Sequence, residues 1–239
     1  MLDGKRIVVT GAGRGIGKAI AIACLEAGAH VGVNVRDEAP LDDALRGASM
    51  LRFDVRDGDA VRRNIDAFAS GGGIHGLVNN AGVNVAGFLV DVKDEDVGAA
   101  FATNIGGTIA CTRAALPHML RARGGAIVNV SSLAAVRPSR GMSIYAATKG
   151  AIESFTRAVA VEYGRKGVRC NCVRPGAIDT ELLAPSRALA EQEILERIPM
   201  RRIGSADEVA RLVVFLLSDA SSYMNGAVHP VDGGLGAGW

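Results

Sequence analysis

The sequence predicts one α/β domain in which a parallel β-sheet is covered by helices on both faces. Short apolar runs alternate with longer helix-like segments along the whole chain, which is typical of repeated β-α units. Several of these runs are apolar almost throughout instead of alternating with polar residues, as expected for strands buried on both sides. The length of 239 residues fits a single core better than two small ones, so we expect residues 1–239 to form one domain.

Seven apolar runs are the candidate strands, and they lie at residues 6–10, 30–35, 50–55, 76–81, 126–131, 168–173 and 227–232. The helical patterns between them cover residues 15–28, 60–71, 96–122, 143–164 and 205–219. The last helix has a clear start, because Ser205 and Glu208 form a capping-box pattern. Residues 181–204 interrupt the alternation and are long for a strand-to-helix connection. Two interpretations of this segment stay open, a substrate lid and an ordinary packed helix pair.

Composition excludes several classes of function. The 27 basic and 25 acidic residues leave a net charge of +2 without a basic block, so we expect no nucleic-acid partner. The longest apolar runs, such as residues 212–217, are too short to cross a bilayer and the N-terminus lacks a signal-peptide pattern, which predicts a cytoplasmic protein with no membrane partner. The four cysteines form no CxxC pair and the four histidines no HxxxH group, so we predict buried thiols and no metal site.

A glycine-rich loop, TGAGRGIG at residues 10–17, connects the first strand directly to the first helix. Gly11, Gly15 and Gly17 allow a tight turn and a close approach of the backbone to a pyrophosphate, with Ile16 between the last two. The helix N-terminus that follows offers unpaired N–H groups and a positive dipole. This context predicts a dinucleotide-binding site, and the alternative is a turn that only packs the helix on the sheet.

The end of the second strand predicts which nicotinamide cofactor is preferred. A carboxylate there binds the ribose 2′-hydroxyl of NAD(H), whereas an arginine accommodates the 2′-phosphate of NADP(H). Residues 34–36 are Asn-Val-Arg, and the glycine loop carries Arg14, so we expect Arg14 and Arg36 to favour NADP(H). Asp37 and Glu38 follow immediately, and either could still reach a ribose hydroxyl, so NAD(H) stays possible.

The stretch SIYAATKGA, residues 143–151, places Tyr145 and Lys149 four positions apart. On a helix these positions are neighbours, so the ammonium can approach the ring edge and favour the phenolate form. Ala146 and Ala147 leave this helix face free of bulky side chains. The pair predicts an acid–base group, although the same spacing also occurs in helices without catalytic function.

These motifs together resemble the compact branch of the short-chain dehydrogenase/reductase family. The resemblance is carried by TGAGRGIG, Asp54-Val55, Asn79-Asn80-Ala81-Gly82, Asn104, Ser131-Ser132, Tyr145 with Lys149, Pro175-Gly176 leading to Thr180, and the closing VDGG at residues 231–234. It spans nearly the whole chain, and it implies a Rossmann-type doubly wound sheet of about seven strands, a nicotinamide cofactor and a homotetramer.

The resemblance also assigns roles to individual positions. Its catalytic tetrad corresponds to Asn104, Ser132, Tyr145 and Lys149, where Ser132 is chosen over Ser131 because the family's serine lies thirteen residues before the tyrosine. In this reading Asp54 binds the adenine amino group with Val55 beside it, and Asn80, Ala81 and Gly82 shield the adenosine ribose. The carboxamide of the nicotinamide is expected against Pro175, Gly176, Ile178 and Thr180. Lys149 also contacts the nicotinamide ribose, and Asn104 anchors a water that links Lys149 to solvent.

Three functions are compatible with this reading. The first is an NADPH-dependent reductase of a ketone, such as a 3-oxoacyl thioester, with Tyr145 as the proton donor and Ser132 holding the substrate oxygen. The second is an NAD-dependent dehydrogenase of a sugar, polyol or cyclic alcohol. The third, a cofactor-binding regulatory protein without activity, is disfavoured by the intact tetrad. Substrate specificity is expected from residues 84–95, 133–142 and 181–204. Arg137, Arg140 and Arg187 could meet an anionic carrier or could simply be solvated.

Overall fold

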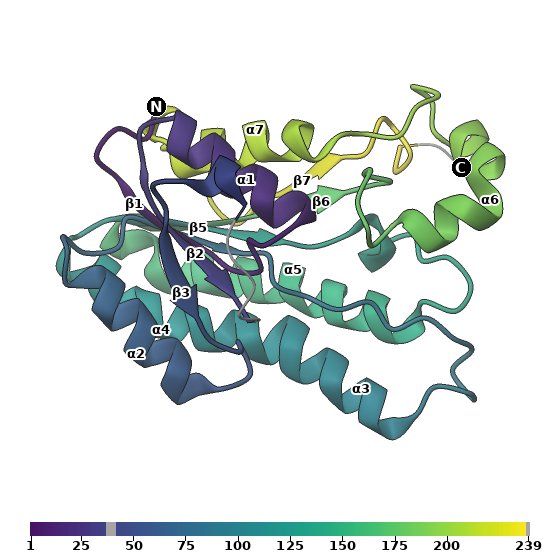
Figure 1. The fold of residues 1–239 in the computed structure, drawn as a ribbon, viewed down its shortest axis with the longest axis horizontal. Helices are drawn as coiled ribbons and strands as arrows, with labels where there is room; N and C mark the ends of the chain where they lie inside the picture. Colours follow the sequence, from purple (N-terminus) through teal and green to yellow (C-terminus); the bar gives the residue numbers. More distant parts are fainter. Residues whose placement is uncertain (37–41, 238–239) are drawn as a thin grey trace.

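In the part of the chain that the structure describes, seven strands run parallel in one sheet, with the order β3-β2-β1-β4-β5-β6-β7 (Figure 1). The computed structural model describes residues 1–36 and 42–237. The strands are β1 (Arg6–Val9), β2 (His30–Val35), β3 (Ser49–Arg52), β4 (Gly76–Asn79), β5 (Gly125–Val130), β6 (Val168–Pro175) and β7 (Val228–Val231). Each lies within or beside a predicted apolar run, so the predicted seven-stranded doubly wound sheet is confirmed.

Helices cover both faces of the sheet. On one face α1 (Gly15–Glu26) packs against α7 (Ala206–Leu217), as Figure 1 shows at the top of the view. The other face carries α2 (Gly58–Ala69), α3 (Asp94–Phe101), α4 (Gly107–Arg121) and α5 (Ser143–Tyr163). Helix α6 (Ala184–Arg197) follows β6 beyond the carboxyl ends of the strands.

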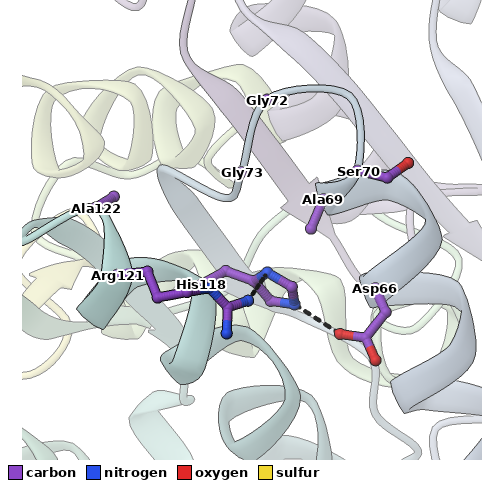
Figure 2. Close-up of a pocket in the computed structure, with 8 residues that line it drawn as sticks. All are labelled: Asp66, Ala69, Ser70, Gly72, Gly73, His118, Arg121 and Ala122. Atoms are coloured by element: carbon purple, nitrogen blue, oxygen red, sulfur yellow. Dashed lines mark hydrogen bonds and ion pairs between the residues drawn. The ribbon is translucent and has the colours of Figure 1, made fainter.

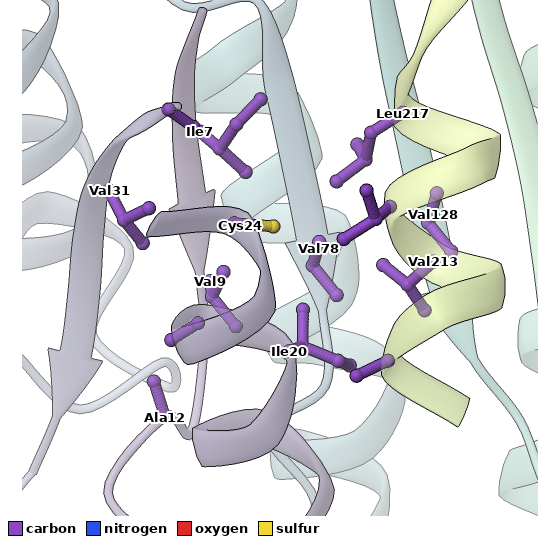
Figure 3. Close-up of a cluster of buried hydrophobic side chains, with 14 of the residues drawn as sticks. Ile7, Val9, Ala12, Ile20, Cys24, Val31, Val78, Val128, Val213 and Leu217 are labelled. Atoms are coloured by element: carbon purple, nitrogen blue, oxygen red, sulfur yellow. The ribbon is translucent and has the colours of Figure 1, made fainter. Parts of the chain in front are cut away.

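The two-sided cover explains why the strands are apolar throughout. Successive residues of a strand point to opposite faces, and in β1 the side chains of Ile7 and Val9 join the core under α1 and α7 whereas Val8 joins the core under α2 and α4. Figure 3 shows the first of these cores, where Ile20 of α1 and Val213 of α7 lie against the strand side chains. Both faces therefore favour apolar residues in most strands, whereas in β6 Arg169 and Asn171 alternate with its two cysteines.

The predicted helix over residues 96–122 is interrupted in the structure. Helix α3 passes through a π-helical turn, Ala102–Gly106, before α4 begins at Gly107. A π turn adds one residue to the helical repeat and is common at functional sites. Asn104 lies within it, and the apolar pattern alone could not reveal this insertion because the residues on either side keep a helical period.

Other sequence predictions can be compared with the structure directly. The capping box is confirmed, since Ser205 and Glu208 exchange side-chain to backbone hydrogen bonds at the start of α7. In residues 181–204, whose backbone is described throughout, α6 is followed by turns instead of a second helix. All four cysteines are buried free thiols. Within the described ranges no helix is long and apolar enough to span a bilayer.

Candidate active site

The predicted site residues lie on segments that follow four neighbouring strands. The glycine loop follows β1, Asn80 follows β4, Ser131 and Ser132 follow β5, and Gly176 follows β6. Because the strands are parallel, their carboxyl ends meet at one edge of the sheet (Figure 1). The strand order reverses between β1 and β4, and open α/β sheets bind ligands in the crevice beyond such a switch point.

The glycine loop has the backbone that a pyrophosphate needs. Gly11 and Gly15 have φ of +62° and +53°, a region that favours glycine. A Cβ at Gly17 would overlap the carbonyl oxygen of Gly11. The side chain of Arg14, at the N-cap of α1, contains no acceptor, so the first N–H groups of the helix stay available for an anion. Ile16 packs on the adjacent core and anchors the loop. The residues present therefore fit a dinucleotide.

Thr10 and Asn80 hold this loop against the end of β4. The Thr10 hydroxyl accepts hydrogen bonds from the backbone N–H groups of Asn80 and Ala81, each at 3.0 Å. The Asn80 side-chain amide donates to the carbonyls of Thr10 and Gly11, again at 3.0 Å. Sequence reasoning predicted Asn80 and Ala81 as cofactor contacts. It missed the supporting role of Thr10, for which the only signal was a hydroxyl at the end of an apolar strand.

The adenosine end of the crevice is lined by exposed charges. Arg56 binds Asp54 with a 2.6 Å contact from Nη2 to Oδ2 and a second contact from Nε at 3.0 Å. These hydrogen bonds hold the pKa of the Asp54 carboxyl below its usual range, and the charge of Arg36 lowers it further. The Val55 side chain packs where a Cβ on Gly107 would stand. Because the charge of Arg36 acts on Asp54, the two side chains lie in the same region of the crevice.

Arg14 has an unexpected partner. Its Nη1 lies 2.8 Å from Glu181 Oε2, and the two side chains are 79% and 68% exposed. This ion pair connects the glycine loop to the beginning of segment 181–204 and partly neutralises a cation predicted to meet the 2′-phosphate. The alternative ribose ligands, Asp37 and Glu38, lie outside the described residues.

Tyr145 and Lys149 lie together on α5, as predicted. The Lys149 ammonium is 5.6 Å from the centroid of the Tyr145 ring. Lys149 is only 4% exposed and Tyr145 only 7%. A hydrogen bond of 2.9 Å from Lys149 Nζ to the carbonyl of Val130 ties the ammonium to the end of β5. The lysine is therefore a fixed cation next to the phenol and not a solvated surface charge.

Asn104 joins three segments around this pair. Its Nδ2 donates to the Val83 carbonyl at 2.9 Å and to the Thr148 hydroxyl at 3.0 Å, while its Oδ1 accepts from the Val83 N–H at 2.8 Å. A Cβ on Gly82 would lie 3.2 Å from Asn104 Oδ1 and 3.5 Å from Lys149 Nζ, so Gly82 allows the two side chains to approach. The side chain of Asn104 supports the catalytic helix directly, and its predicted water contact stays a prediction.

The two serines after β5 have different environments. Ser131 is buried, with its Oγ 2.9 Å from Glu153 Oε1 and 3.2 Å from the Lys149 carbonyl. Ser132 is only half-buried and its Oγ accepts a hydrogen bond of 3.2 Å from the Ala134 N–H. Accepting that bond leaves the Ser132 proton for another acceptor. The contrast supports Ser132 over Ser131 as the residue that contacts a substrate oxygen.

The segment after β6 approaches the glycine loop from the other side. Pro175 ends β6, and a Cβ on Gly176 would lie 2.7 Å from Cβ of Asp232, the residue that follows β7. Ile178 is buried, and the Thr180 side chain lies 3.5 Å from where a Cβ on Gly15 would stand. The residues predicted to hold the nicotinamide carboxamide thus lie opposite the phosphate loop.

The segments expected to set specificity are in contact. The Gly87 N–H donates to the Gly141 carbonyl at 2.9 Å, and the guanidinium of Arg140 lies 5.5 Å from the centroid of the exposed Phe88 ring. Arg137 donates a 3.0 Å hydrogen bond to the Leu235 carbonyl. The Arg187 side chain lies outside the described residues. The loops at residues 84–95 and 133–142 therefore contact each other through one backbone hydrogen bond and one cation–π contact.

Sequence reasoning missed a buried ion pair behind the serines. Glu153 of α5 and Arg174 of β6 form a bidentate contact with distances of 2.7 and 2.8 Å. One signal was available, because Glu153 stands four residues after Lys149 and Arg174 interrupts an apolar strand. An acid and a base at positions expected to be buried predict pairing.

A separate cavity of about 450 Å³ lies between the ends of α2 and α4, at the opposite edge of the sheet. Figure 2 shows His118 between Asp66 and Arg121, with 2.6 Å from His118 Nε2 to Asp66 Oδ1 and 2.7 Å from Nδ1 to Arg121 Nη2. Arginine can only donate, so Nδ1 accepts and Nε2 carries the proton. Both ring nitrogens are therefore engaged, Nε2 with Asp66 of α2 and Nδ1 with Arg121 of the same helix α4, and this cavity lies at the edge of the sheet opposite the glycine loop.

Comparison with known proteins shows which family the chain belongs to. The family model described as enoyl-(acyl carrier protein) reductase matches residues 11–236. A 3-oxoacyl-[acyl-carrier-protein] reductase of Chlamydia trachomatis is 36% identical over 98% of both chains. The chain belongs to the short-chain dehydrogenase/reductase family. As a member of this family it is an NAD(P)-dependent oxidoreductase, which argues against the interpretation as a protein without activity.

Other members of the family have different substrates. An L-xylulose reductase of Caenorhabditis elegans is 36% identical over 97% of this chain and 95% of its own. A gluconate 5-dehydrogenase of Burkholderia cenocepacia, solved in complex with NADP and tartrate, is 33% identical with a TM-score of 0.92 and covers 100% of this chain and 97% of its own. Family membership therefore fixes the class of reaction and leaves the substrate open.

Proposed function

We propose that the protein reduces a ketone, a 3-oxoacyl thioester or a similar carbonyl compound, to a secondary alcohol with NADPH. The observation that carries this proposal is the buried Tyr145–Lys149 pair, 5.6 Å from ammonium to ring centroid, at the same sheet edge as the glycine loop. Arg14 and Arg36 support NADP(H) over NAD(H), because each can meet a 2′-phosphate. The similarity to 3-oxoacyl-[acyl-carrier-protein] reductases supports this substrate class.

The proposed mechanism assigns one task to each side chain. The nicotinamide, when bound, supplies the hydride. Tyr145 holds a proton on its hydroxyl and donates it to the substrate oxygen as negative charge develops there. The fixed ammonium of Lys149 stabilises the resulting phenolate. The Ser132 hydroxyl donates a second hydrogen bond to the same oxygen. Asn104 keeps α5 in register with the loop after β4 through its contacts to Val83 and Thr148.

The cofactor is proposed to extend across the sheet edge from these residues. Its pyrophosphate is assigned to Gly11, Gly15 and Gly17, and its adenosine to Asp54 and the neighbouring turn. The remaining proposed contacts are Arg14, Ile16, Arg36, Val55, Asn80, Ala81, Gly82, Pro175, Gly176, Ile178 and Thr180. Lys149 is also assigned to the nicotinamide ribose. A homotetramer, supported only by the resemblance, can be checked by light scattering of the purified protein.

A second function is favoured by a specific observation. Glu181 neutralises Arg14, which weakens the case for a 2′-phosphate at this position. Because Arg14 is paired in this way, the alternative that we infer is oxidation of a sugar, polyol or cyclic alcohol with NAD. The similarity to an L-xylulose reductase and to a gluconate 5-dehydrogenase supports this class of substrate.

One experiment separates the two functions. Dissociation constants for NADPH and NADH are measured by fluorescence titration, and turnover is then screened against ketones, aldehydes, acyl thioesters, sugars and polyols. We expect tighter binding of NADPH and reduction of a ketone. A clear preference for NADH together with oxidation of a polyol would replace the first proposal with the second.

A further inference from the structure

Behind the catalytic residues lies a buried network of three polar side chains, Ser131, Glu153 and Arg174. The Glu153 carboxylate receives Arg174 Nε at 2.8 Å and Nη2 at 2.7 Å, and the Ser131 hydroxyl at 2.9 Å. The Glu153 side chain is 6% exposed and that of Arg174 is 20% exposed. Every polar atom of the carboxylate therefore has a partner, and the contact is largely shielded from water.

Each member of the network adjoins a residue of the proposed site. Glu153 stands one helical turn after Lys149 on the same face of α5. Ser131 precedes Ser132 and also lies 3.2 Å from the Lys149 carbonyl. Arg174 directly precedes Pro175 and Gly176. Strands β5 and β6 are hydrogen-bonded neighbours and α5 packs on them, so the network joins three elements of the site (Figure 1).

Stability alone does not account for such a network. Removing two charges from water is costly, and well-packed apolar residues often stabilise a fold as well as a buried ion pair does. An ion pair adds geometric specificity, because a bidentate arginine–carboxylate contact fixes both the distance between the two side chains and their relative orientation. This network does so where α5 must keep Tyr145 and Lys149 aligned with Ser132.

The network also contributes to the charge around the catalytic lysine. The groups gathered here are Lys149 and Glu153 on α5, Cys172 and Arg174 on β6, and Asp232 after β7. Burial raises the pKa of the Cys172 thiol to about 12, so it stays neutral, and the negative charge of Glu153 adds to this shift. Arg174 is therefore the counter-ion that keeps Glu153, one turn after Lys149, from opposing a phenolate at Tyr145 two turns away on the same helix.

We propose that Glu153 and Arg174, with Ser131, are positioning residues that fix the catalytic helix against the ends of β5 and β6 and balance the charge beside Lys149. The proposal rests on the proposed function of Tyr145 and Lys149. It predicts that loss of Arg174 leaves an unpaired carboxylate, which disfavours the Tyr145 phenolate, whereas loss of both charges restores the balance. A purely structural role would change stability without moving the pH dependence of the reaction.

The test compares Arg174→Gln, Arg174→Lys, Glu153→Gln and the double variant Glu153→Gln/Arg174→Gln with the wild-type protein. The matched control is Arg62→Gln, which breaks an exposed arginine–carboxylate pair on α2. We expect Arg174→Gln to lower kcat by about 10- to 100-fold with a smaller change in KM. Its midpoint for alcohol oxidation should move to higher pH by about 1 unit. The double variant should return this midpoint to the wild-type value, and Arg174→Lys should recover part of kcat.

The proposal is overturned if folded Arg174→Gln keeps the wild-type kcat and pH midpoint, or if the double variant shifts the midpoint as far as the single one. If Arg174→Gln does not fold, kcat is measured instead for Glu153→Gln and for the double variant, in which neither position is charged. Amide hydrogen exchange gives a readout that needs no turnover, since residues 143–153 should exchange faster in each network variant than in Arg62→Gln, and equal exchange contradicts the proposal. Failure of the proposed function is recognised separately, because wild-type turnover would then be absent or would survive Tyr145→Phe.

Discussion

The proposed catalytic residues and the charges around the proposed adenosine site lie at the same edge of the sheet, but they are held by different kinds of contact. Asn104 and Lys149 are buried, and their hydrogen bonds end on the backbone or on other buried groups. Arg14, proposed to select the cofactor, and Arg56, beside Asp54, instead pair with carboxylates in contact with water. Buried polar groups lose much if a partner is removed, whereas exposed ion pairs contribute little and can exchange partners.

This difference separates the proposed chemistry of the site from its proposed choice of cofactor. The chemistry depends on side chains whose positions are fixed by several elements at once. In the proposed function, the choice between NADP(H) and NAD(H) depends on Arg14 and Arg36, which are long exposed side chains, and we expect the pairing of Arg14 with Glu181 to change when a 2′-phosphate binds. Substitutions of the buried residues Tyr145 and Asn104 should therefore have larger effects than substitutions of the more exposed Glu181 and Glu208.

The largest effect is expected for Tyr145→Phe. The ring is retained, so the fold and NADPH binding should persist, but the proton donor is lost and kcat should fall by about 10³-fold. Tyr163→Phe, at the end of the same helix, is the matched control and should keep wild-type turnover. Turnover by Tyr145→Phe within tenfold of the wild type would remove the tyrosine from the mechanism.

Asn104→Ala should combine a loss of stability with a loss of rate. It leaves the half-buried backbone groups of Val83 and the buried Thr148 hydroxyl without their partner, which should lower the free energy of unfolding by about 2–4 kcal/mol. Urea denaturation measures this change. The control is Asn64→Ala on α2, which loses one hydrogen bond to the Ala60 carbonyl. Equal effects of the two substitutions would contradict the supporting role of Asn104.

Glu181→Gln should act on cofactor choice alone. Removing the carboxylate frees Arg14, and the dissociation constant for NADPH should fall by about 2- to 5-fold while that for NADH stays unchanged. The gain should shrink as salt is added, because both charges are exposed. Glu193→Gln on α6, which breaks the exposed pair with Arg197, is the control. An equal change for NADPH and NADH would show that Arg14 does not meet the 2′-phosphate.

The smallest effect is expected at the exposed capping box of α7. Hydrogen bonds from Arg202 and Ser205 lower the pKa of Glu208 to about 2. An unfolded glutamate titrates near pH ~4.3, so the carboxylate stabilises the fold above that pH and the contribution is lost as the pH falls toward about 2. Wild-type protein should therefore lose more stability than Glu208→Gln between these values in acid denaturation. Parallel curves for both proteins would be evidence against this assignment.

The sequence predicted the sheet, its seven strands and the proximity of Tyr145 to Lys149, because each depends on local periodicity or spacing. It did not predict the π turn at Asn104, since one extra residue leaves the apolar pattern intact. Nor did it predict that Glu181 would pair with Arg14, because the two are far apart in sequence and both are exposed. The Glu153–Arg174 pair was detectable in principle as charges at buried positions, but identifying the partners required the packing of α5 on β6.

The central claim is that the Tyr145–Lys149 pair faces the reactive end of a bound nicotinamide cofactor. A crystal structure of the protein with NADP⁺ tests it most directly. We expect the pyrophosphate to bind the glycine loop at residues 11–17, and the nicotinamide ribose to lie within hydrogen-bonding distance of Tyr145 and Lys149. A nicotinamide located away from Tyr145, or a Tyr145 hydroxyl directed out of the crevice, would contradict it.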